Sequence, residues 1–326
     1  MKSLSNHVVL FLLTLTTAVA GPFGIGGDYD VIVKDNMTVN STHIHGSTLV
    51  GGRLSLTGNM SEFGNQQPSG TGAGVTVNQT INLGTSGRIN GDGILRVGAL
   101  TSGQSINASQ DLVGGGKTLY ANQATVGATG IDVSAAFEGL IALSNALAGL
   151  TPTLSASSLT TGDAQNRQLN LSFNSSSPFN VLNLTGAQLR DFKNISVADP
   201  GQSKSGLIIN VDLTGYAGGA FVQNRNGSGA GADLILWNFF GGSSLSLKNQ
   251  FYGTILAPEL SVTHTNNDLK GAVMAESFTK NYGQVHRHHY EGDVPEVHVP
   301  DSGSTAVLLM LSGFGLWAFQ RGRRSL

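Results

Sequence analysis

Short apolar segments with a period of two lie on both sides of the middle of the chain. Examples are VTVNQTINL at 75–83, GLIINVDL at 206–213 and DLILWNF at 233–239. Successive side chains of an extended chain point to opposite faces, so this alternation is typical of strands that bury one face. The pattern predicts an all-β body built from many short strands.

One segment in the middle of the chain, residues 131–150, has the spacing of a helix instead. Asp132 or Ser134 is placed to cap its start, and Gly149 with Pro152 is placed to end it. We expect this long helix to lie along the β body and to bury one apolar side against it. The residues predicted on that side are Phe137, Leu140, Ile141 and Leu147.

A repeat is visible among the predicted strands. GTILAPELS at 253–261 aligns with GAVMAESFT at 271–279 at an offset of 18 residues, and 93–101 fits the same frame. The segment 46–55 fits it with one residue inserted. If the match is not a chance result of glycine richness, it indicates the coils of a β-solenoid that resembles a parallel β-helix. The alternative is a sandwich with similar hairpins, but long connections such as ELSVTHTNNDLKG suit coil turns better.

The N-terminus has the features of a secretory signal peptide. Residues 1–20 combine Lys2 with an apolar stretch, and Ala18 and Ala20 form a small-residue cleavage pattern after which we expect cutting. The apolar stretch is far shorter than the ~20 residues that span a bilayer, which disfavours an uncleaved anchor. The mature chain is therefore predicted to be exported, and it has no cysteine for disulfides.

Composition narrows the range of partners. Only 12% of residues are charged and the net charge is −2, so no basic stripe exists to neutralise phosphates, and we expect no nucleic-acid partner. The 45 glycines favour strands joined by tight turns, and the 40% of hydrophobic residues argues against disorder.

The histidine-rich segment QVHRHHYEGDVP at 284–295 is the strongest candidate for chemistry. In an extended segment His286 and His288 point to one side, and His264 or Glu291 could complete a metal site. Nothing in the sequence fixes that third ligand. We therefore prefer a polar final strand with surface histidines, and we expect neither a native metal nor a cofactor.

Signals for catalysis are missing. The Gly227-Ser228-Gly229 tripeptide lies in a glycine-rich loop and not in a nucleophile elbow, and no paired carboxylates stand out. Regular Thr-x-Thr repeats, which would suit an ice-binding solenoid, are also absent. Thr263-His264-Thr265 stands alone.

The C-terminus ends in a polar motif, an apolar run and a group of arginines. The run from Ser304 to Phe319 is short but long enough for a thin membrane, and the arginines after it are expected to stay in the cytoplasm. This predicts a transmembrane segment at 304–319, transiently in the inner membrane. The residues that set its orientation are Arg321, Arg323 and Arg324.

This tail, residues 299–326, resembles the VPDSG-CTERM sorting signals, relatives of PEP-CTERM tails. The resemblance implies cutting by an exosortase-like processing enzyme at the membrane surface. A GPI signal is the rival, but such tails end in apolar residues and this one ends in RGRRSL. The residues that match the sorting motif are Val299, Pro300, Asp301, Ser302 and Gly303.

The body, residues 28–295, resembles the choice-of-anchor A domain family. The segments that carry the resemblance are 29–56, 233–239, 251–263 and 285–295. His286, Tyr290, Gly292 and Pro295 fall where such domains carry His, an aromatic residue, Gly and Pro, whereas His288 and His289 depart from that pattern. The family has no established catalytic residues, so the resemblance implies surface display or adhesion.

Two functions remain open at this point. The first is a non-enzymatic protein of the cell surface or extracellular matrix, structural or adhesive, associated with exopolysaccharide or another surface glycan. In this account the tail tethers the chain to the membrane until it is processed. The alternative is a polysaccharide-processing solenoid enzyme, which a close pair of carboxyl groups in one cleft would favour. Ice binding is a more distant third.

Overall fold

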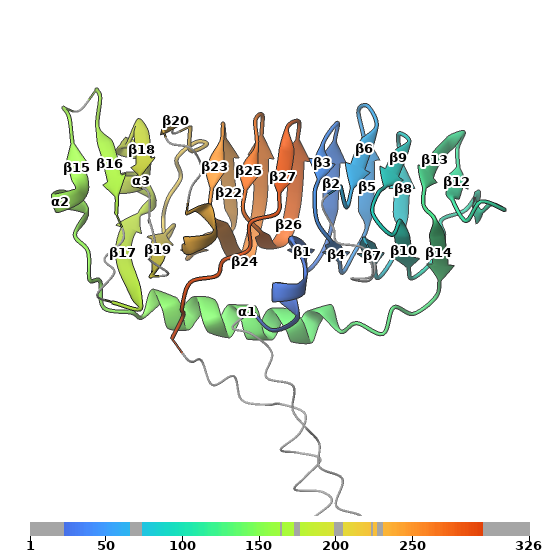
Figure 1. Cartoon of the computed structure of the whole chain (residues 1–326), viewed down its shortest axis with the longest axis horizontal. Coiled ribbons are helices and arrows are strands. Elements are labelled where there is room, and N and C mark those ends of the chain that lie inside the picture. The colour runs from blue at the N-terminus through green and yellow to red at the C-terminus, as the bar shows by residue number, and fades with distance from the viewer. Residues whose placement is uncertain are drawn as a thin grey trace, which may run out of the picture.

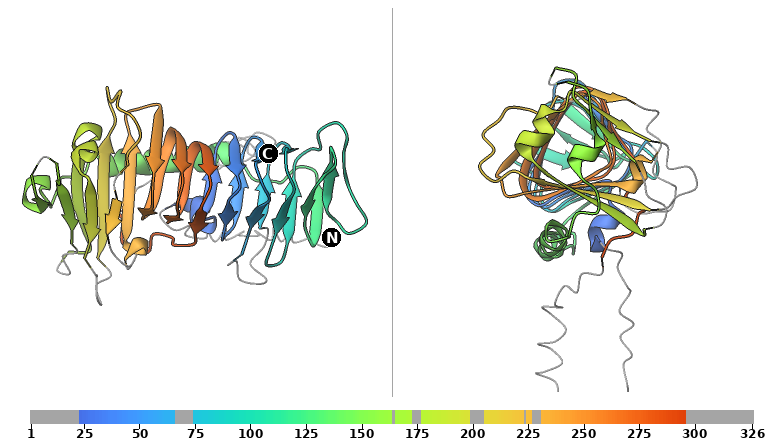
Figure 2. Two further views of the ribbon diagram at one scale, coloured as in Figure 1. Left: turned by 90° about the horizontal axis from the view of Figure 1, so that it is seen from above. Right: turned by 90° about the vertical axis from the view of Figure 1, so that its left-hand side faces the viewer.

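The computed structural model describes residues 23–65, 74–163, 165–172, 177–198, 205–222, 224–226 and 231–295. Its strands stack side by side into one elongated body, and a long helix, α1 (Val133–Ala148), runs along the outside (Figure 1). Seen down the long axis, the strands close around a core and α1 lies beyond them (Figure 2). Almost all neighbouring strands pair in parallel, as the coils of a solenoid do. The predicted β-helix-like body with one long helix alongside is therefore confirmed.

The first face of the body is the one that α1 covers. Its strands pair in the spatial order β14, β10, β7, β4, β1, β26, β24, β21, β19, β17. Their bounds are β14 Gln123–Val126, β10 Ile94–Val97, β7 Val75–Val77, β4 Thr48–Val50, β1 Val31–Val33, β26 Val273–Asn281, β24 Thr254–Thr265, β21 Ile235–Phe240, β19 Gly206–Asp212 and β17 Phe179–Thr185.

The second face follows a corner that the two longest strands cross. The first halves of β24 and β26 belong to the first face, and their second halves belong to the second. The remaining strands of this face are β8 (Ile81–Leu83), β5 (Leu54–Thr57), β2 (Met37–Asn40) and β22 (Ser244–Lys248).

The third face is a separate sheet. Its strands are β11 (Gln104–Ile106), β12 (Leu112–Gly114), β13 (Lys117–Tyr120), β9 (Gly87–Ile89), β6 (Ser61–Phe63), β3 (His43–Ile44), β27 (Gln284–His286), β25 (Leu269–Lys270) and β23 (Phe251–Tyr252). In this order the strands from β13 to β23 pair in parallel, and β11 and β12 at one end pair antiparallel. A four-stranded sheet continues this row in Figure 1, with β15 (Thr160–Thr161), β16 (Gln168–Leu171), β18 (Asn194–Val197) and β20 (Asn224–Asn226).

Both ends of the solenoid finish in antiparallel pairs. At one end β11, β12 and β13 pair antiparallel, and at the other end β15 pairs antiparallel with β16. An open parallel edge would be a template for pairing with another chain, and these short turned-back strands blunt it. The remaining short helices are η1 (Gly24–Asp28), α2 (Ala156–Leu159), α3 (Gly186–Asp191) and η2 (Ala232–Leu234).

The order of coils in space differs from their order in the chain. From β1 the chain builds coils outward to β14, α1 then runs back along the whole body, and the coils after it build inward from the other end (Figure 1). The first and last coils therefore meet in the middle, where β1 pairs with β26 and β3 with β27. No pattern in the sequence predicts this seam between the two halves.

The repeat in the sequence corresponds to this stacking, with one correction. Ile255 pairs with Val273 and Ala257 with Ala275, which is the predicted offset of 18 residues. After Ala257 the register shifts, and Ser261 faces Ser277 at an offset of 16. The strands of the other two repeat segments, β4 and β10, lie in the same sheet. The second part of the predicted alignment is therefore wrong by two residues, because β24 has a bulge at the corner.

Helix α1 packs on the first face much as predicted. Asp132 caps its start, accepting a hydrogen bond from the Ala135 amide at 3.0 Å, and Gly149 follows its last residue. Ile141, predicted to be buried, is only half-buried, and Leu143 takes its place in the contact. The outward residues that receive the helix come from neighbouring strands of both halves and include Ile32, Leu49, Ile208, Leu236, Leu256 and Met274.

An asparagine ladder holds the C-terminal half of α1. Asn183, Asn210 and Asn238 are aligned on β17, β19 and β21. The Asn238 amide donates to the carbonyl of Ser144 and to Asn210 Oδ1, both at 2.9 Å. The Asn210 amide donates to the carbonyl of Leu147 at 2.7 Å and to Asn183 Oδ1 at 3.0 Å. These bonds tie the last turns of the helix to β19 and β21, and the Leu147 carbonyl accepts from the Leu150 amide as well, at 3.1 Å.

Candidate functional site

The second face presents regular rows of small polar side chains. Its strands alternate buried and outward positions, so every second residue points away from the core. We call these outward residues the hydroxyl–amide face. Its central row is Ser246, Thr263, Thr279, Thr38, Ser55 and Asn82, on six strands in register. A second row beside it is Lys248, Thr265, Asn281, Asn40 and Thr57.

The side chains of the hydroxyl–amide face are oriented by bonds between neighbouring strands. The Asn40 amide donates to Asn281 Oδ1 at 3.4 Å, and the hydroxyls of Ser261 and Ser277 lie 2.6 Å apart. Parallel strands lie about 4.8 Å apart, so the six-strand row spans roughly 24 Å. The two rows contain one charged residue, Lys248, at one end. The face is therefore regular, polar and nearly uncharged.

Among the strands of this face, Thr-x-Thr occurs on β24, yet the central row still brings threonines together in space. Thr279 lies next to Thr263, and Thr38 lies next to Thr279. The row joins strands from both ends of the chain, because the seam brings β2 beside β26. Sequence periodicity was unable to reveal a row in which Thr38 and Thr279, more than 200 residues apart in the chain, are neighbours.

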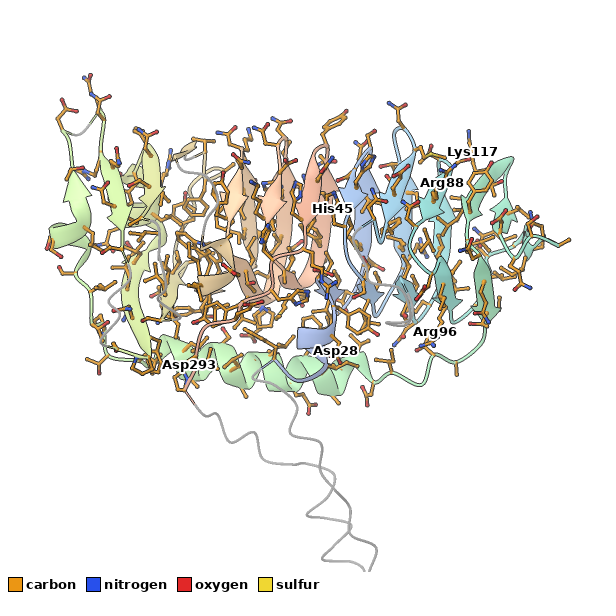
Figure 3. The ribbon with its side chains drawn as sticks, in the orientation of Figure 1. Asp28, His45, Arg88, Arg96, Lys117 and Asp293 are labelled. Carbon is orange, nitrogen blue, oxygen red and sulfur yellow. The ribbon has the colours of Figure 1, made fainter. Side chains whose placement is uncertain are left out.

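The third face has a different character. Its outward row contains Tyr120, Arg88, Glu62, His43 and Gln284. The Arg88 guanidinium lies 6.0 Å from the centre of the Tyr120 ring, and Arg88 and Lys117 are close to each other in the upper part of Figure 3. Charged and aromatic groups thus gather on this face, whereas the two rows of the hydroxyl–amide face contain one charged residue, Lys248, and no aromatic residue.

His264, a candidate metal ligand, is a core residue. It is fully buried on the inward side of β24, and its Nε2 donates to the Asn249 carbonyl at 2.8 Å. Burial, together with the charge of Lys280 beside it, lowers the pKa of His264 to about 3. The imidazole is therefore neutral at physiological pH.

This arrangement predicts a dependence of stability on pH. Between about pH 6.5 and pH 3 the unfolded chain binds a proton at His264 that the folded chain excludes, so the free energy of unfolding falls as the pH falls through this range. His264→Gln keeps a donor for Asn249 but does not titrate. In chemical denaturation from pH 7 to pH 4, the variant should lose less stability than the wild type, by up to about 1.4 kcal/mol per pH unit. Equal losses would contradict a buried neutral His264.

His286 pairs with other groups and not with His264. His286 Nε2 is 3.2 Å from an Asp268 carboxylate oxygen, and its ring centre is 4.4 Å from that of His45. Burial lowers the pKa of both His286 and His288. Within the described ranges, no three residues among His, Asp and Glu are grouped so that they could hold a metal ion.

The segment 287–293 fastens the end of the domain to its first strand. His289 Nε2 lies 2.8 Å from the buried carboxylate of Asp30, and the Tyr290 ring packs edge-on against Phe23 at 6.2 Å. Gly292 is required here, because a Cβ atom would come within 2.6 Å of the Tyr290 hydroxyl. The histidine, tyrosine and glycine of this segment thus dock the C-terminal segment onto the body.

An open hollow of about 740 Å³ lies beside this segment. Asp28, the last residue of η1, and Arg96 on β10 line it, and both lie in the lower part of the body in Figure 3. Both acidic and basic side chains line the hollow, so its lining selects neither anions nor cations. Its other titratable lining residues include Asp233, Arg287, His288, His289 and Glu291.

The predicted signal peptide and sorting tail lie outside the described residues. This holds for Ala18, Ala20, the motif at 299–303 and the arginines after the apolar run. Among the helices of the described part, none is long and apolar enough to cross a bilayer.

The architecture is a β-solenoid with one helix along its length and a polar face of aligned hydroxyl and amide groups. The family model pAdhesive_15, "Putative Ice-binding-like adhesive domain", matches residues 22–287. The chain belongs to this adhesive-domain family. A domain of this kind is a non-enzymatic module of extracellular or cell-surface proteins. No curated protein matches the chain.

Solved structures of ice-binding proteins resemble the chain at low identity. One from an Arctic yeast is 12% identical with a TM-score of 0.38, covering 85% of this chain and 96% of that one. One from an Antarctic biological consortium is 16% identical with a TM-score of 0.40, covering 87% and 100%. A domain from Shewanella frigidimarina is 12% identical with a TM-score of 0.36, covering 85% and 99%.

Proposed function

We propose that the protein is an adhesin of the cell surface or extracellular matrix whose binding surface is the hydroxyl–amide face. The observation that carries the proposal is the register of this face, which places hydroxyl and amide groups in straight rows over six strands. Such rows suit a ligand that is itself extended and repeating. An exopolysaccharide or another surface glycan has this form and exchanges hydrogen bonds with hydroxyls and amides.

The positions of the two ends of the described body are compatible with display of the hydroxyl–amide face at the cell surface. Phe23 and Tyr290 are in contact, so both ends of the described body emerge beside α1. The hydroxyl–amide face is a different side of the solenoid from the one that α1 covers. A tether at the C-terminus would therefore leave this face open to the surroundings.

Export and sorting are part of the proposal. We infer that residues 1–20 direct export, that 28–295 form a choice-of-anchor A-like domain, and that 299–326 hold the chain in the inner membrane until an exosortase-like enzyme cuts it. The support is the order of the VPDSG motif, apolar run and arginines in the sequence.

The sorting proposal predicts a shortened mature protein. Changing Pro300 and Asp301 to Ala should leave membrane insertion intact but block cutting, so the variant should be membrane-bound and heavier by the mass of the tail. Mass spectrometry of the protein from its own host measures both forms. An intact C-terminus ending in Arg324-Ser325-Leu326 on most wild-type molecules would show a permanent anchor and would end the sorting hypothesis.

Ice is a second candidate ligand, favoured by the threonine and serine rows that the sequence did not reveal. Ice, like a polysaccharide, is an extended and regular array of hydroxyl groups, and the family description includes ice binding. The two ligands separate in one assay, in which the protein is incubated with insoluble polysaccharides or with slowly growing ice. Retention on polysaccharide alone supports the first candidate, and enrichment in ice alone supports the second. The polysaccharide-processing alternative is not proposed, because an adhesive domain is non-enzymatic.

A further inference from the structure

At the ridge between the second and third faces the chain turns through left-handed residues, two in succession after β24 (Asn266 and Asn267) and after β26 (Tyr282 and Gly283). In five neighbouring coils, the first residue after the strand is left-handed. The φ angles at these positions lie between 53° and 70°. Register places them in one line, since each follows the last residue of an aligned strand. The five residues are Asn249, Asn266, Tyr282, Ser41 and Gly58.

Tyr282 is the residue in this line whose bulky side chain disfavours a left-handed backbone. Glycine and asparagine tolerate the left-handed region, whereas a bulky side chain there is an outlier that needs a reason. Its side chain is 52% exposed and forms no hydrogen bond, ion pair or ring contact within the described part of the chain. Packing therefore does not explain the ring. Residues held in rare conformations gather at functional sites.

A buried lysine supports the corner from beneath. Lys280, two residues before Tyr282, is fully buried on the inward side of β26. Its ammonium group donates to the carbonyl of Asn267 at 3.0 Å and also to the carbonyl of Tyr282. Placing an ammonium group inside the body is unfavourable unless it is hydrogen-bonded. Here its bonds link the corner at Tyr282, which carries the exposed ring, to the neighbouring corner at Asn267.

The ring borders the hydroxyl–amide face at the centre of its length. Asn281, Asn40 and Thr265 are the outward residues nearest to this corner in the second row. The Asn40 amide donates to Asn281 Oδ1 at 3.4 Å, which orients both side chains. An exposed aromatic ring, two aligned amides and a hydroxyl thus adjoin one another without a charged group in the set.

We propose that Tyr282, with Asn281, Asn40 and Thr265, is a subsite for one pyranose ring of a bound polysaccharide chain. One side of a pyranose presents C–H groups that pack on the electron-rich face of an aromatic ring, and its rim of hydroxyls needs donors and acceptors beside that ring. The corner offers both. This inference rests on the proposed adhesive function and names its ligand class, because ice has no C–H surface for the ring to cover.

The test compares the full chain with Tyr282→Asn in a detergent that has no sugar headgroup. Probes are soluble hexasaccharides of β-1,4-linked glucose, β-1,4-linked mannose, β-1,3-linked glucose and α-1,4-linked galacturonate, titrated calorimetrically. We expect binding of at least one probe, weakened at least tenfold by Tyr282→Asn. Because asparagine suits the left-handed corner, the melting temperature of the variant should stay equal or rise. Tyr282→Phe should bind like the wild type.

Tyr120→Asn is the matched control, since Tyr120 is also exposed but lies on the third face. It should leave binding unchanged. Equal binding by the wild type and Tyr282→Asn would overturn the subsite, and so would a melting temperature lowered by several degrees, which would make the ring structural. If the wild type binds none of the hexasaccharides, the sugar assignment falls. Adhesion itself would survive that result if the protein still bound an insoluble surface or ice.

Discussion

Replacing Leu140 with Asp should lower the free energy of unfolding by about 4 kcal/mol. Leu140 is 1% exposed and lies in the apolar cluster between α1 and the first face. A carboxylate there would be surrounded by side chains such as Leu236 and Met274, which offer it no hydrogen bond or cation. The new side chain must either be buried as a charge or pull the helix away from the body. For a domain of this size we expect a melting temperature lower by roughly 10 °C.

The matched control places the same side chain elsewhere on the same helix. Ala135 is exposed in the first turn of α1, where an acidic group interacts favourably with the helix dipole. Ala135→Asp should therefore change stability by less than about 0.5 kcal/mol. Differential scanning calorimetry measures both variants. If Leu140→Asp has the same melting temperature as the wild type, α1 is not docked on the first face.

Replacing Asn210 with Leu should lower the free energy of unfolding by about 2 to 4 kcal/mol. Asn210 is 1% exposed and lies in the middle of the ladder under α1. The substitution keeps the volume but removes the donor to the Leu147 carbonyl and the acceptor for the Asn238 amide. Both partners remain buried, so at least one polar group loses its bond without gaining water.

Asn183 provides the control within the same ladder. It is exposed at the outer end, and its amide donates to the Leu150 carbonyl at a longer distance of 3.4 Å. Asn183→Leu also removes the Oδ1 acceptor of the Asn210 amide. Both lost bonds lie at the exposed end of the ladder, where water can replace them, so the variant should lower stability by less than about 1 kcal/mol. Urea denaturation measures the free energy of unfolding of the two variants. Equal effects at the two positions would contradict a role for burial in the ladder.

Local patterns in the sequence predicted the parts of the fold that depend on neighbours in the chain. The alternation at 206–213 and 233–239 became β19 and β21, and the helical spacing at 131–150 became α1. Asn210 and Asn238 read as interruptions in apolar strands, because the helix carbonyls they bind come from 63 and 94 residues away. Their role depends on tertiary contacts that no local pattern contains.

The hydroxyl–amide face was missed for a related physical reason. Each of its strands contributes one or two outward hydroxyls or amides, which in the sequence cannot be told from ordinary surface residues. Thr38 and Thr279 become neighbours only through the seam at β2 and β26. Tyr282 carried no signal either, because a left-handed φ angle is invisible in a sequence that lacks glycine at that position. The histidines were the candidate metal ligands in the sequence, yet His264 is in the core and His289 pairs with Asp30.

The central claim is that the hydroxyl–amide face binds an extended ligand without chemical change. Its direct test is the fraction of protein retained on insoluble polysaccharides and on ice, together with the release of new reducing ends. Thr38→Lys with Thr263→Lys puts two long charged side chains on the face, two strands apart. Glu62→Lys with Gln284→Lys does the same on the third face at the same spacing and serves as the control.

We expect the wild type and the control to be retained alike on at least one of these surfaces. The Thr38→Lys and Thr263→Lys variant should be retained at least tenfold less at an unchanged melting temperature, and no sample should release reducing ends. Retention of that variant at the wild-type level would contradict the assignment of the face. Release of reducing ends by the wild type would contradict an adhesive function without catalysis.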